Sequence, residues 1–347
     1  MENIVASAHR AHHRSRSRTG KDQLKLTIAL AHNLRRSDDE SEAELDSQAS
    51  IDAIAHHISL LGHRVIPLCV DGPVSGVVNE LERVRPDLVF NIAEGRIGKF
   101  REAFFPALFE QLGLPCTGSD AGTLAIAIDK ALTKRIVGQP VAAGALALDR
   151  HALALAARSL TLPVIVKPNC EGSSKGITQK SVCRSVNEVI AVGAELLARY
   201  PAGVLVEEFV DGSDVAVAWL EPVGALAPAA FHYPVAAGEL AIYDLALKGS
   251  EQARVTVEVP AQLPPALVRE LERRTHDVMR ALGIRDIGRV DWRIDRSGRP
   301  VFLEVNALPA MTPGLDHELY RAARERGLRE PKDVLAAVIE SALARAA

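Results

Sequence analysis

Apolar residues in the first third of the chain recur at two spacings that alternate with each other. The mostly apolar segment 24–30 indicates a buried strand, and residues 46–61 carry apolar side chains at helical spacing until Gly62. Apolar runs at 64–70 and 87–92 then continue the order of strand and helix. Because parallel strands are joined by crossover helices, this order predicts an α/β unit built on a parallel sheet.

The middle of the chain is predicted to contain a helix at 119–139, a strand at 163–167 and a helix at 185–200. The strand leads into a loop at 168–176 that carries glycine and serine residues. Such a loop offers backbone amides and hydroxyl groups that could fold over phosphate oxygens. It matches neither a P-loop nor a dinucleotide-binding glycine pattern, so the loop alone is weak support for a nucleotide site.

Residues 204–345 are predicted to contain two strand pairs and two helices. A turn at Asp211-Gly212 joins the first strand pair, and a turn at 296–298 joins the second. The predicted elements are strands at 204–209 and 214–220, a helix at 264–282, strands at 287–294 and 300–305, and a terminal helix at 334–345.

Composition and charge exclude some classes of protein. The chain has 347 residues, of which 48% are hydrophobic and 24% charged, which is typical of a globular protein with two or three compact units. Its net charge of −3 argues against a protein that holds nucleic acid by bulk electrostatics. The charge is uneven, because residues 1–21 hold five basic residues and one acidic residue and the rest of the chain is acidic. We expect this basic tail to be disordered.

Cysteine usage and hydropathy give expectations about the compartment. The four cysteines lie far apart, with no Cys-x-x-Cys pair, so the sequence predicts neither a zinc cluster nor a disulfide framework. No run of about 18 apolar residues is present, and the tail lacks the apolar stretch of a signal peptide. These patterns predict a cytoplasmic protein with no membrane partner.

The most informative chemistry lies on the last predicted strand pair. Side chains two positions apart on a strand point to the same face, so Arg289 and Asp291 share one face, as do Glu304 and Asn306, while Val290 points to the other. An antiparallel pair would bring Asp291, Glu304 and Asn306 together beside Arg289. Two carboxylates and an amide oxygen are hard ligands suited to Mg²⁺. The alternative is a structural ion pair between Arg289 and one acid.

Three lysines are placed where a bound polyphosphate would need cations. Lys167 ends the strand that precedes the loop at 168–176, and Lys130 and Lys248 follow other predicted elements. Each lysine alone is more often a solvated surface charge. Together with an acid cluster of the magnesium type, they fit phosphoryl transfer from a nucleotide.

Four short motifs follow one another in the second half of the chain. They are Lys-Pro with Glu-Gly-Ser-Ser at 167–174, Glu-Glu-Phe at 207–209, Arg-Val-Asp at 289–291 and Leu-Glu-Val-Asn-Ala-Leu-Pro at 303–309. This ordered set resembles the D-alanine:D-alanine ligase branch of the ATP-grasp superfamily.

The resemblance implies an α/β protein with the ATP-grasp fold and an N-terminal doubly wound parallel-sheet domain. It implies an N-terminal substrate domain at 22–117, a central ATP-grasp subdomain at 118–206 and a C-terminal subdomain at 207–347 that carries the metal site. ATP would lie between the last two, and both substrates would reach the same cleft.

The resemblance also implies residues that contact ATP. Two lysines would contact the phosphates, a short hinge would bind adenine through backbone groups, and an acid would bind the ribose. That acid is Asp214, where the family has a glutamate. The implied ATP contacts are Lys130, Lys167, Glu171, Ser174, Glu207, Glu208, Phe209, Val210 and Asp214.

The implied reaction joins a carboxylate to an amine. A carboxylate is a poor acyl donor because its leaving group would be oxide, so ATP first converts it to an acylphosphate that the amine then attacks. The resemblance assigns Lys248 to the transferred phosphate, Arg289 to the charged intermediate and Ser173 to the first substrate. Asp291, Glu304 and Asn306 would hold Mg²⁺, with Mn²⁺ as a substitute, and the loop would exclude water as a lid.

The departures from the family lie on the substrate side. The acidic segment 37–46 contains six acids in ten residues, and its Glu44 stands beside the position from which the family binds the first amine. Glu94 falls in the segment where the family has a histidine, and Lys99 falls where an acid is expected. The acidic segment 37–46 is either a solvated loop or a site that meets a substrate amine.

The second substrate would meet two further changes. Ala310 stands in place of a glycine, and Leu315 replaces a serine that would bind the carboxylate of the second substrate. Leucine cannot donate that hydrogen bond, and an unpaired buried carboxylate would cost several kcal/mol, about a thousandfold in affinity. The sequence therefore supports the ATP half better than it supports D-alanine as second substrate.

Three functions remain open from the sequence. The first is a D-alanine:D-alanine ligase, and the second is a related ligase that joins other amino acids or a small-molecule acid in natural-product biosynthesis. The third is a nucleotide-binding regulator without catalysis. The expected partners are small-molecule amino-acid or carboxylic-acid substrates, without nucleic acid, and the resemblance implies a homodimer.

Overall fold

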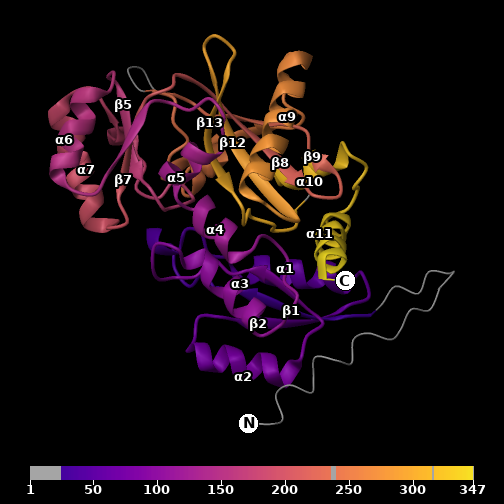
Figure 1. The fold of residues 1–347 in the computed structure, drawn as a ribbon. Coiled ribbons are helices and arrows are strands. Elements are labelled where there is room, and N and C mark those ends of the chain that lie inside the picture. The colour runs from indigo at the N-terminus through magenta and orange to yellow at the C-terminus, as the bar shows by residue number, and fades with distance from the viewer. Residues whose placement is uncertain (1–24, 236–239, 315, 347) are drawn as a thin grey trace.

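The computed structural model describes residues 25–235, 240–314 and 316–346, which form three β-sheets with helices packed against them (Figure 1). The basic tail at 1–21 and Leu315 lie outside the described residues. No helix in the described ranges has both the length and the apolar content needed to cross a bilayer.

The N-terminal sheet has three parallel strands in the order β2-β1-β3. The prediction of a parallel sheet with crossover helices is therefore confirmed. Its strands are β1 (Thr27–His32), β2 (Arg64–Cys69) and β3 (Leu88–Ile92), and its helices are α1 (Gln48–Ser59), α2 (Val74–Val84) and α3 (Arg101–Gln111).

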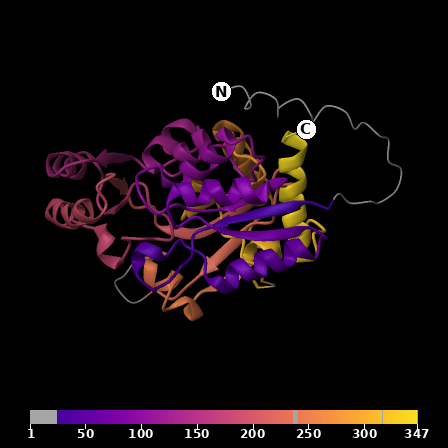
Figure 2. The same cartoon turned by 90° about the horizontal axis from the view of Figure 1, so that it is seen from below.

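Both faces of this sheet are covered, as in a doubly wound fold. On one face Ile28 and Leu30 pack against α1 and against α11 (Pro331–Ala346) from the opposite end of the chain. On the other face Ala29 packs against α2 and α3 in a second hydrophobic cluster. Figure 2 shows α11 lying beside the N-terminal sheet. The terminal helix, predicted at 334–345, thus completes the N-terminal core.

The second sheet is antiparallel, in the order β4-β7-β5-β6, and forms the lobe on the left of Figure 1. Helices α6 and α7 pack on it through a shared hydrophobic cluster. Its strands are β4 (Gly144–Ala147), β5 (Val164–Pro168), β6 (Val182–Cys183) and β7 (Val204–Glu208), and the helices are α6 (Arg150–Ser159) and α7 (Val186–Arg199). Strand β7 spans the predicted subdomain boundary at 206. The strand that follows, Gly212–Leu220, lies in the third sheet, so the expected strand pair joined at Asp211-Gly212 is wrong.

The single helix predicted at 119–139 is wrong, because the chain forms two shorter helices there. They are α4 (Ala121–Ala127) and α5 (Lys130–Ile136). Asp129 has extended backbone angles, and its carboxylate accepts a hydrogen bond from the Leu132 amide, so it ends one helix and caps the next. The apolar spacing hides this break, which decides where Lys130 points.

The third sheet has six strands, in the order β11-β10-β8-β12-β13 with β9 beside β8. Its buried face packs against α9 and α4, with Val290 and Trp292 fully enclosed. Its elements are β8 (Gly212–Leu220), β9 (Gly224–Ala225), β10 (Ala229–His232), β11 (Thr256–Glu258), β12 (Ile287–Asp295), β13 (Pro300–Asn306), α8 (Leu245–Lys248), α9 (Pro265–Leu282) and α10 (Glu318–Arg324).

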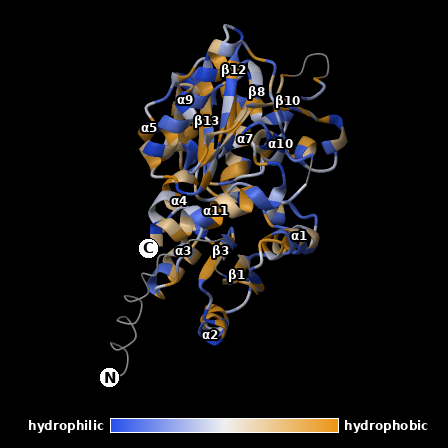
Figure 3. Ribbon diagram, turned by 90° about the vertical axis from the view of Figure 1, so that its right-hand side faces the viewer, coloured by the Kyte–Doolittle hydropathy of each residue, from blue (hydrophilic) through white to orange (hydrophobic). Residues whose placement is uncertain are grey.

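In Figure 3 the strands β8, β12 and β13 carry orange segments beside blue ones, and the helices likewise show both colours. The opposite face of the third sheet carries the polar side chains of β12 and β13, whereas along β8 it is apolar and Ala218 and Leu220 pack in the N-terminal core. This face looks toward the second sheet and toward the N-terminal sheet below it (Figure 1).

Candidate functional site

Strands β12 and β13 place the predicted metal ligands on one face. Arg289 lies opposite Asn306, and Asp291 lies opposite Glu304. Arg289 forms a bidentate ion pair with Asp291, in which Nε donates to Oδ1 at 2.7 Å and Nη2 donates to Oδ2 at 2.9 Å. The Asn306 amide donates to Asp291 Oδ2 at 3.2 Å. The four side chains come together as their spacing predicts, and the ion pair considered as the alternative is also present.

Glu304 is held by cations from other elements. Lys130, at the start of α5, lies 2.9 Å from Glu304 Oε2 and donates to the Glu171 carbonyl at 2.5 Å. Burial raises the pKa of Glu304, but the charges of Lys130, Lys248 and Lys167 outweigh it and lower that pKa to about 2. Glu304 is therefore a carboxylate at neutral pH.

A buried cation that the sequence analysis missed is Lys134. The Glu207 carboxylate lies between Lys134 and Lys167, with both N···O distances at 2.8 Å. Burial raises the pKa of Glu207, and the two lysines more than offset it and lower the pKa. Lys130 and Lys134 are four residues apart on a helix and share a face, which is the signal that could have revealed the second lysine.

The predicted adenine hinge at 207–210 already makes several backbone hydrogen bonds with neighbouring residues of the protein. The Glu208 amide donates to the Ala143 carbonyl at 2.8 Å, and the Phe209 amide donates to the Pro163 carbonyl at 2.9 Å. The Val210 carbonyl accepts from Arg293 Nε at 2.9 Å. The hinge is therefore fixed on both sides by β4, β5 and β12.

The predicted ribose acid, Asp214, has two partners that the sequence analysis missed. Arg293 lies 2.6 Å from Asp214 Oδ1, and the Tyr233 hydroxyl donates to Oδ2 at 2.5 Å. Arg293 also lies over the Phe209 ring, 5.5 Å from its centroid. Arg293 and Asp214 face each other on neighbouring strands, so the pairing of β8 with β12 creates this contact.

Residues 170–176, which form most of the loop predicted at 168–176, have an unusual backbone conformation. Ser173 and Ser174 have φ values of 47° and 56°, in the left-handed region that L-residues rarely adopt. The Ser174 hydroxyl donates to the Tyr243 carbonyl at 2.8 Å. Lys248 lies 5.3 Å from the centroid of the Tyr243 ring. Burial first, and then the nearby charge of Arg289, lower the pKa of Lys248.

The acidic segment does not leave Glu44 free for a substrate. Its carboxylate accepts from Arg101 Nη2 at 2.7 Å, from Lys175 Nζ at 2.6 Å and from the Gly172 amide at 2.5 Å. Two cations neutralise Glu44 in this structure, so a substrate amine would have to displace one of them, and the assignment of Glu44 to a substrate stays a prediction. Arg101 lies 57 residues away in sequence, so no local pattern could predict the pair.

Glu94 lies in a group of acids on the N-terminal side of the cleft. Burial, followed by the charges of Glu102 and Glu44, raises the pKa of Glu94 well above its usual value. Burial also raises the pKa of Glu102 to about 7 and that of Asp46 to about 6. Lys99, the base expected to alter substrate recognition, pairs instead with Asp129 at 2.7 Å.

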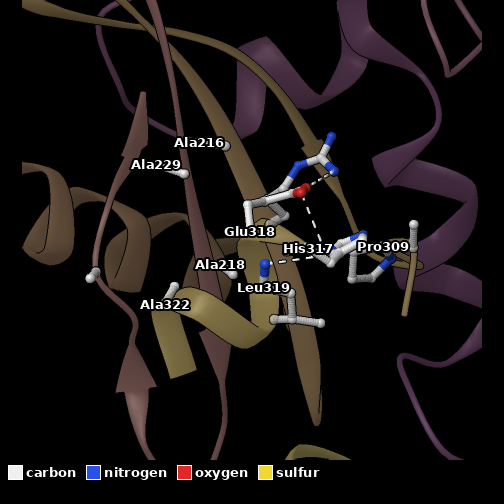
Figure 4. Close-up of a pocket in the computed structure, with 11 residues that line it drawn as sticks. Ala216, Ala218, Ala229, Pro309, His317, Glu318, Leu319 and Ala322 are labelled. Carbon is white, nitrogen blue, oxygen red and sulfur yellow. Dashed lines mark hydrogen bonds and ion pairs between the residues drawn. The ribbon is translucent and has the colours of Figure 1, made fainter. Parts of the chain in front are cut away.

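A small hollow lies next to Arg289, with a cavity volume of about 10 Å³, room for a single water molecule. Its floor is formed by alanines of β8 and β10, and Ala310 forms part of its wall. Figure 4 shows His317 and Glu318 pointing toward each other at its rim, with His317 Nδ1 3.4 Å from Glu318 Oε2. Glu318 also lies 3.9 Å from Arg289. Leu315, the other predicted acceptor contact, is outside the described residues.

The donor set on β12 and β13 suits a hard divalent cation. It consists of the carboxylates of Asp291 and Glu304 and the amide of Asn306. The two acidic side chains are each about one-fifth exposed, and Asn306 is half-buried. No group of three or more His, Cys, Asp or Glu side chains that could hold a metal ion occurs in the described ranges. Oxygen donors facing neighbouring cations fit Mg²⁺ shared with phosphate oxygens.

Comparison with known proteins gives a consistent family. The family model described as D-ala D-ala ligase C-terminus matches residues 142–340. A D-alanine–D-alanine ligase of Xanthomonas axonopodis pv. citri is 34% identical over 279 residues, which cover 75% of this chain and 79% of the relative.

Two solved structures share the fold. The D-alanine–D-alanine ligase from Bacillus anthracis complexed with ATP has a TM-score of 0.72 at 19% identity and covers 92% of this chain and 98% of its own. The VanG D-Ala:D-Ser ligase from Enterococcus faecalis has a TM-score of 0.69 at 20% identity, with coverages of 92% and 100%. The ATP-grasp architecture with an N-terminal parallel sheet, implied by the resemblance, is confirmed.

Proposed function

Because the chain belongs to the D-alanine–D-alanine ligase family, we propose that it is an ATP-dependent ligase that joins a carboxylate to an amine through an acylphosphate. The observation that carries this proposal is the polar face of β12 and β13. Two carboxylates, an amide and Arg289 lie there together, with Lys130 against Glu304.

The nucleotide would lie between the second and third sheets. Lys130 and Lys167 would contact its phosphates, after exchanging their present carboxylate partners for phosphate oxygens. The hinge at 207–210 would receive adenine, and Asp214 would accept from the ribose while Arg293 keeps it in place. Glu171 and Ser174 would fix the loop that covers the phosphates.

Asp291, Glu304 and Asn306 would hold Mg²⁺ or Mn²⁺. When bound, the ion would withdraw charge from the phosphate that is transferred. The Glu304 carboxylate is charged at neutral pH, so this residue is ready to accept a cation.

The fixed cations of the chain would do the remaining electrostatic work. Arg289 would stabilise the charged intermediate, and Lys248 would reach the transferred phosphate. Ser173 would contact the first substrate. Because these groups are partly buried and already oriented, they act in a medium of low polarity, where each charge has a larger effect than in water.

The acceptor is the less defined half of the reaction. Glu318 lines the hollow beside Arg289, and a carboxylate there repels a second substrate that carries its own carboxylate close by. This observation favours the second version of the function, a ligase that joins other amino acids or a small-molecule acid. The D-alanine:D-alanine version stays open, since a small hollow suits a methyl group.

A coupled phosphate-release screen with single and paired amino acids separates these versions. Robust turnover with D-alanine alone would exclude the second version. ATP binding without phosphate release for any acid-amine pair would favour the non-catalytic regulator instead. We further propose a homodimer, which light scattering on the full chain would check.

A further inference from the structure

The loop at 170–176 is tied to the N-terminal segment at its first end through Glu44. The Gly172 amide and Lys175 Nζ both donate to this carboxylate, and Arg101 completes its shell while donating to the Cys170 carbonyl at 2.9 Å. Each of the three charged side chains is less than one-tenth exposed. A Cβ on Gly172 would lie 2.5 Å from Glu44 Oε1, so any larger residue would push the Glu44 carboxylate away from the Gly172 amide.

The second end of the loop is tied through Glu40, one turn earlier in the same segment. Its carboxylate accepts from the Gly176 amide at 2.5 Å and from the Tyr200 hydroxyl at 2.7 Å, and it also pairs with Arg199. Gly176 has a φ of 72°, and a Cβ there would lie within 3.0 Å of Pro168 and of Tyr200. Both ends of the loop therefore rest on carboxylates that come from outside the second sheet.

We propose that Glu40 and Glu44 are positioning residues that clamp the loop at 170–176 in its closed conformation over the nucleotide phosphates. This inference rests on the proposed function for the place of ATP, but the clamp itself rests on the contacts above. It gives the acidic segment a role that neither a solvated loop nor a substrate-amine site would have.

The clamp explains why the loop can hold its strained conformation. Ser173 and Ser174 both adopt positive φ, which residues other than glycine hold only when the surrounding structure supports them. Two carboxylates that bind backbone amides at either end restrict the loop to this conformation. Without them, the loop would open, and water would reach the phosphates.

Glu42 offers a matched control within the same segment. Its carboxylate accepts from the Arg36 amide at 2.6 Å, the Ser37 amide at 2.9 Å and Arg96 Nη1 at 2.9 Å. All of these partners belong to the N-terminal unit. Removing Glu42 changes the charge of the segment by the same amount but takes no contact from the loop.

Hydrogen–deuterium exchange on the full chain tests the clamp without any substrate. Glu40→Ala with Glu44→Ala should raise amide exchange in the peptide covering 170–181 by about tenfold or more, since exchange follows local opening. Glu42→Ala should leave that peptide unchanged. The single variant Glu40→Ala, which removes the more exposed carboxylate, should loosen only the Gly176 end and guards against misfolding of the double variant. Unchanged exchange in the double variant, or an equal rise in Glu42→Ala, would overturn the clamp.

Calorimetric titration with MgATP tests what the clamp does for the nucleotide. The double Ala variant should bind MgATP about fivefold or more weakly, and the double Gln variant, which keeps the acceptor oxygens, should recover part of that loss. Faster exchange with unchanged MgATP affinity would contradict a role in closing the loop over ATP. Failure of every variant and of the parent chain to bind MgATP would instead contradict the proposed function, because the exchange result stands by itself.

Discussion

The two sides of the cleft manage their charges in different ways. On the nucleotide side, acids such as Glu207 and Glu304 are each held by lysines, and their pKa values are lowered. On the N-terminal side, Glu94, Glu102 and Asp46 lie close together with raised pKa values. In the proposed function, phosphate and metal would take over charges that the first arrangement already holds in place. The second stores protons and favours a cation, so the two sides contribute differently to stability and to turnover.

The largest expected effect comes from removing a charge on the nucleotide side. Glu304→Gln should lower ligation-dependent phosphate release by about a hundredfold or more, because it removes a ligand for a group that offsets charge in the transition state. Phosphate release with the acid-amine pair found by the screen is the measurement. Glu330→Gln, an exposed residue paired with Lys332, is the control and should behave like the parent chain. Full activity of Glu304→Gln would refute the metal assignment.

The buried pairs on the nucleotide side should also matter for folding. Lys134→Met leaves Glu207 with one of its two cations and should lower the free energy of unfolding by about 2 kcal/mol or more. The thermal midpoint reports this change. Arg273→Met, which breaks an exposed pair with Asp277, should cost less than about 0.5 kcal/mol. Equal losses in both variants would mean that burial does not distinguish these pairs.

The buried acids on the N-terminal side should make the stability of the protein fall as the pH rises, the opposite of the effect of an ion-paired acid. The folded-state pKa of Asp46 is raised to about 6 by burial, against 3.8 for the free group, so stability falls as the pH rises between these values. Asp46→Asn removes that penalty and should stabilise the protein by about 1–3 kcal/mol at pH 7.5. Near pH 4 the gain should vanish. Unfolding midpoints at the two pH values check this, and a gain independent of pH would contradict it.

The smallest expected effect is on the basic tail. The motifs of the nucleotide site all lie beyond residue 24, so deleting residues 1–21 should leave ATP turnover unchanged. Steady-state phosphate release by the shortened chain measures this. A large loss would mean that the tail takes part in the site.

The parts of the site that lie on strands could be predicted from sequence because strand periodicity fixes which side chains share a face. Arg289, Asp291, Glu304 and Asn306 meet for that reason alone. Apolar spacing predicts the ends of helices less well. It indicates one helix at 119–139, whereas the Asp129 side chain caps a new helix and ends the first.

The contacts of the acidic segment could not be predicted, because they join residues far apart in sequence. Glu44 meets Arg101 across 57 positions and Lys175 across 131. Nothing in the local pattern specifies such partners, and family resemblance pointed to a substrate amine instead. Ion pairs between loops of different units depend on how the units pack, which only the structure shows.

The acylphosphate is the centre of the account, and oxygen-18 transfer tests it most directly. A carboxylate donor labelled in both oxygens is incubated with MgATP, the amine and the full chain, and the released phosphate is analysed by mass spectrometry. An acylphosphate route moves one labelled oxygen from the donor into phosphate for each amide formed, with ADP as the other product. Unlabelled phosphate, or AMP and pyrophosphate in place of ADP and phosphate, would contradict the account.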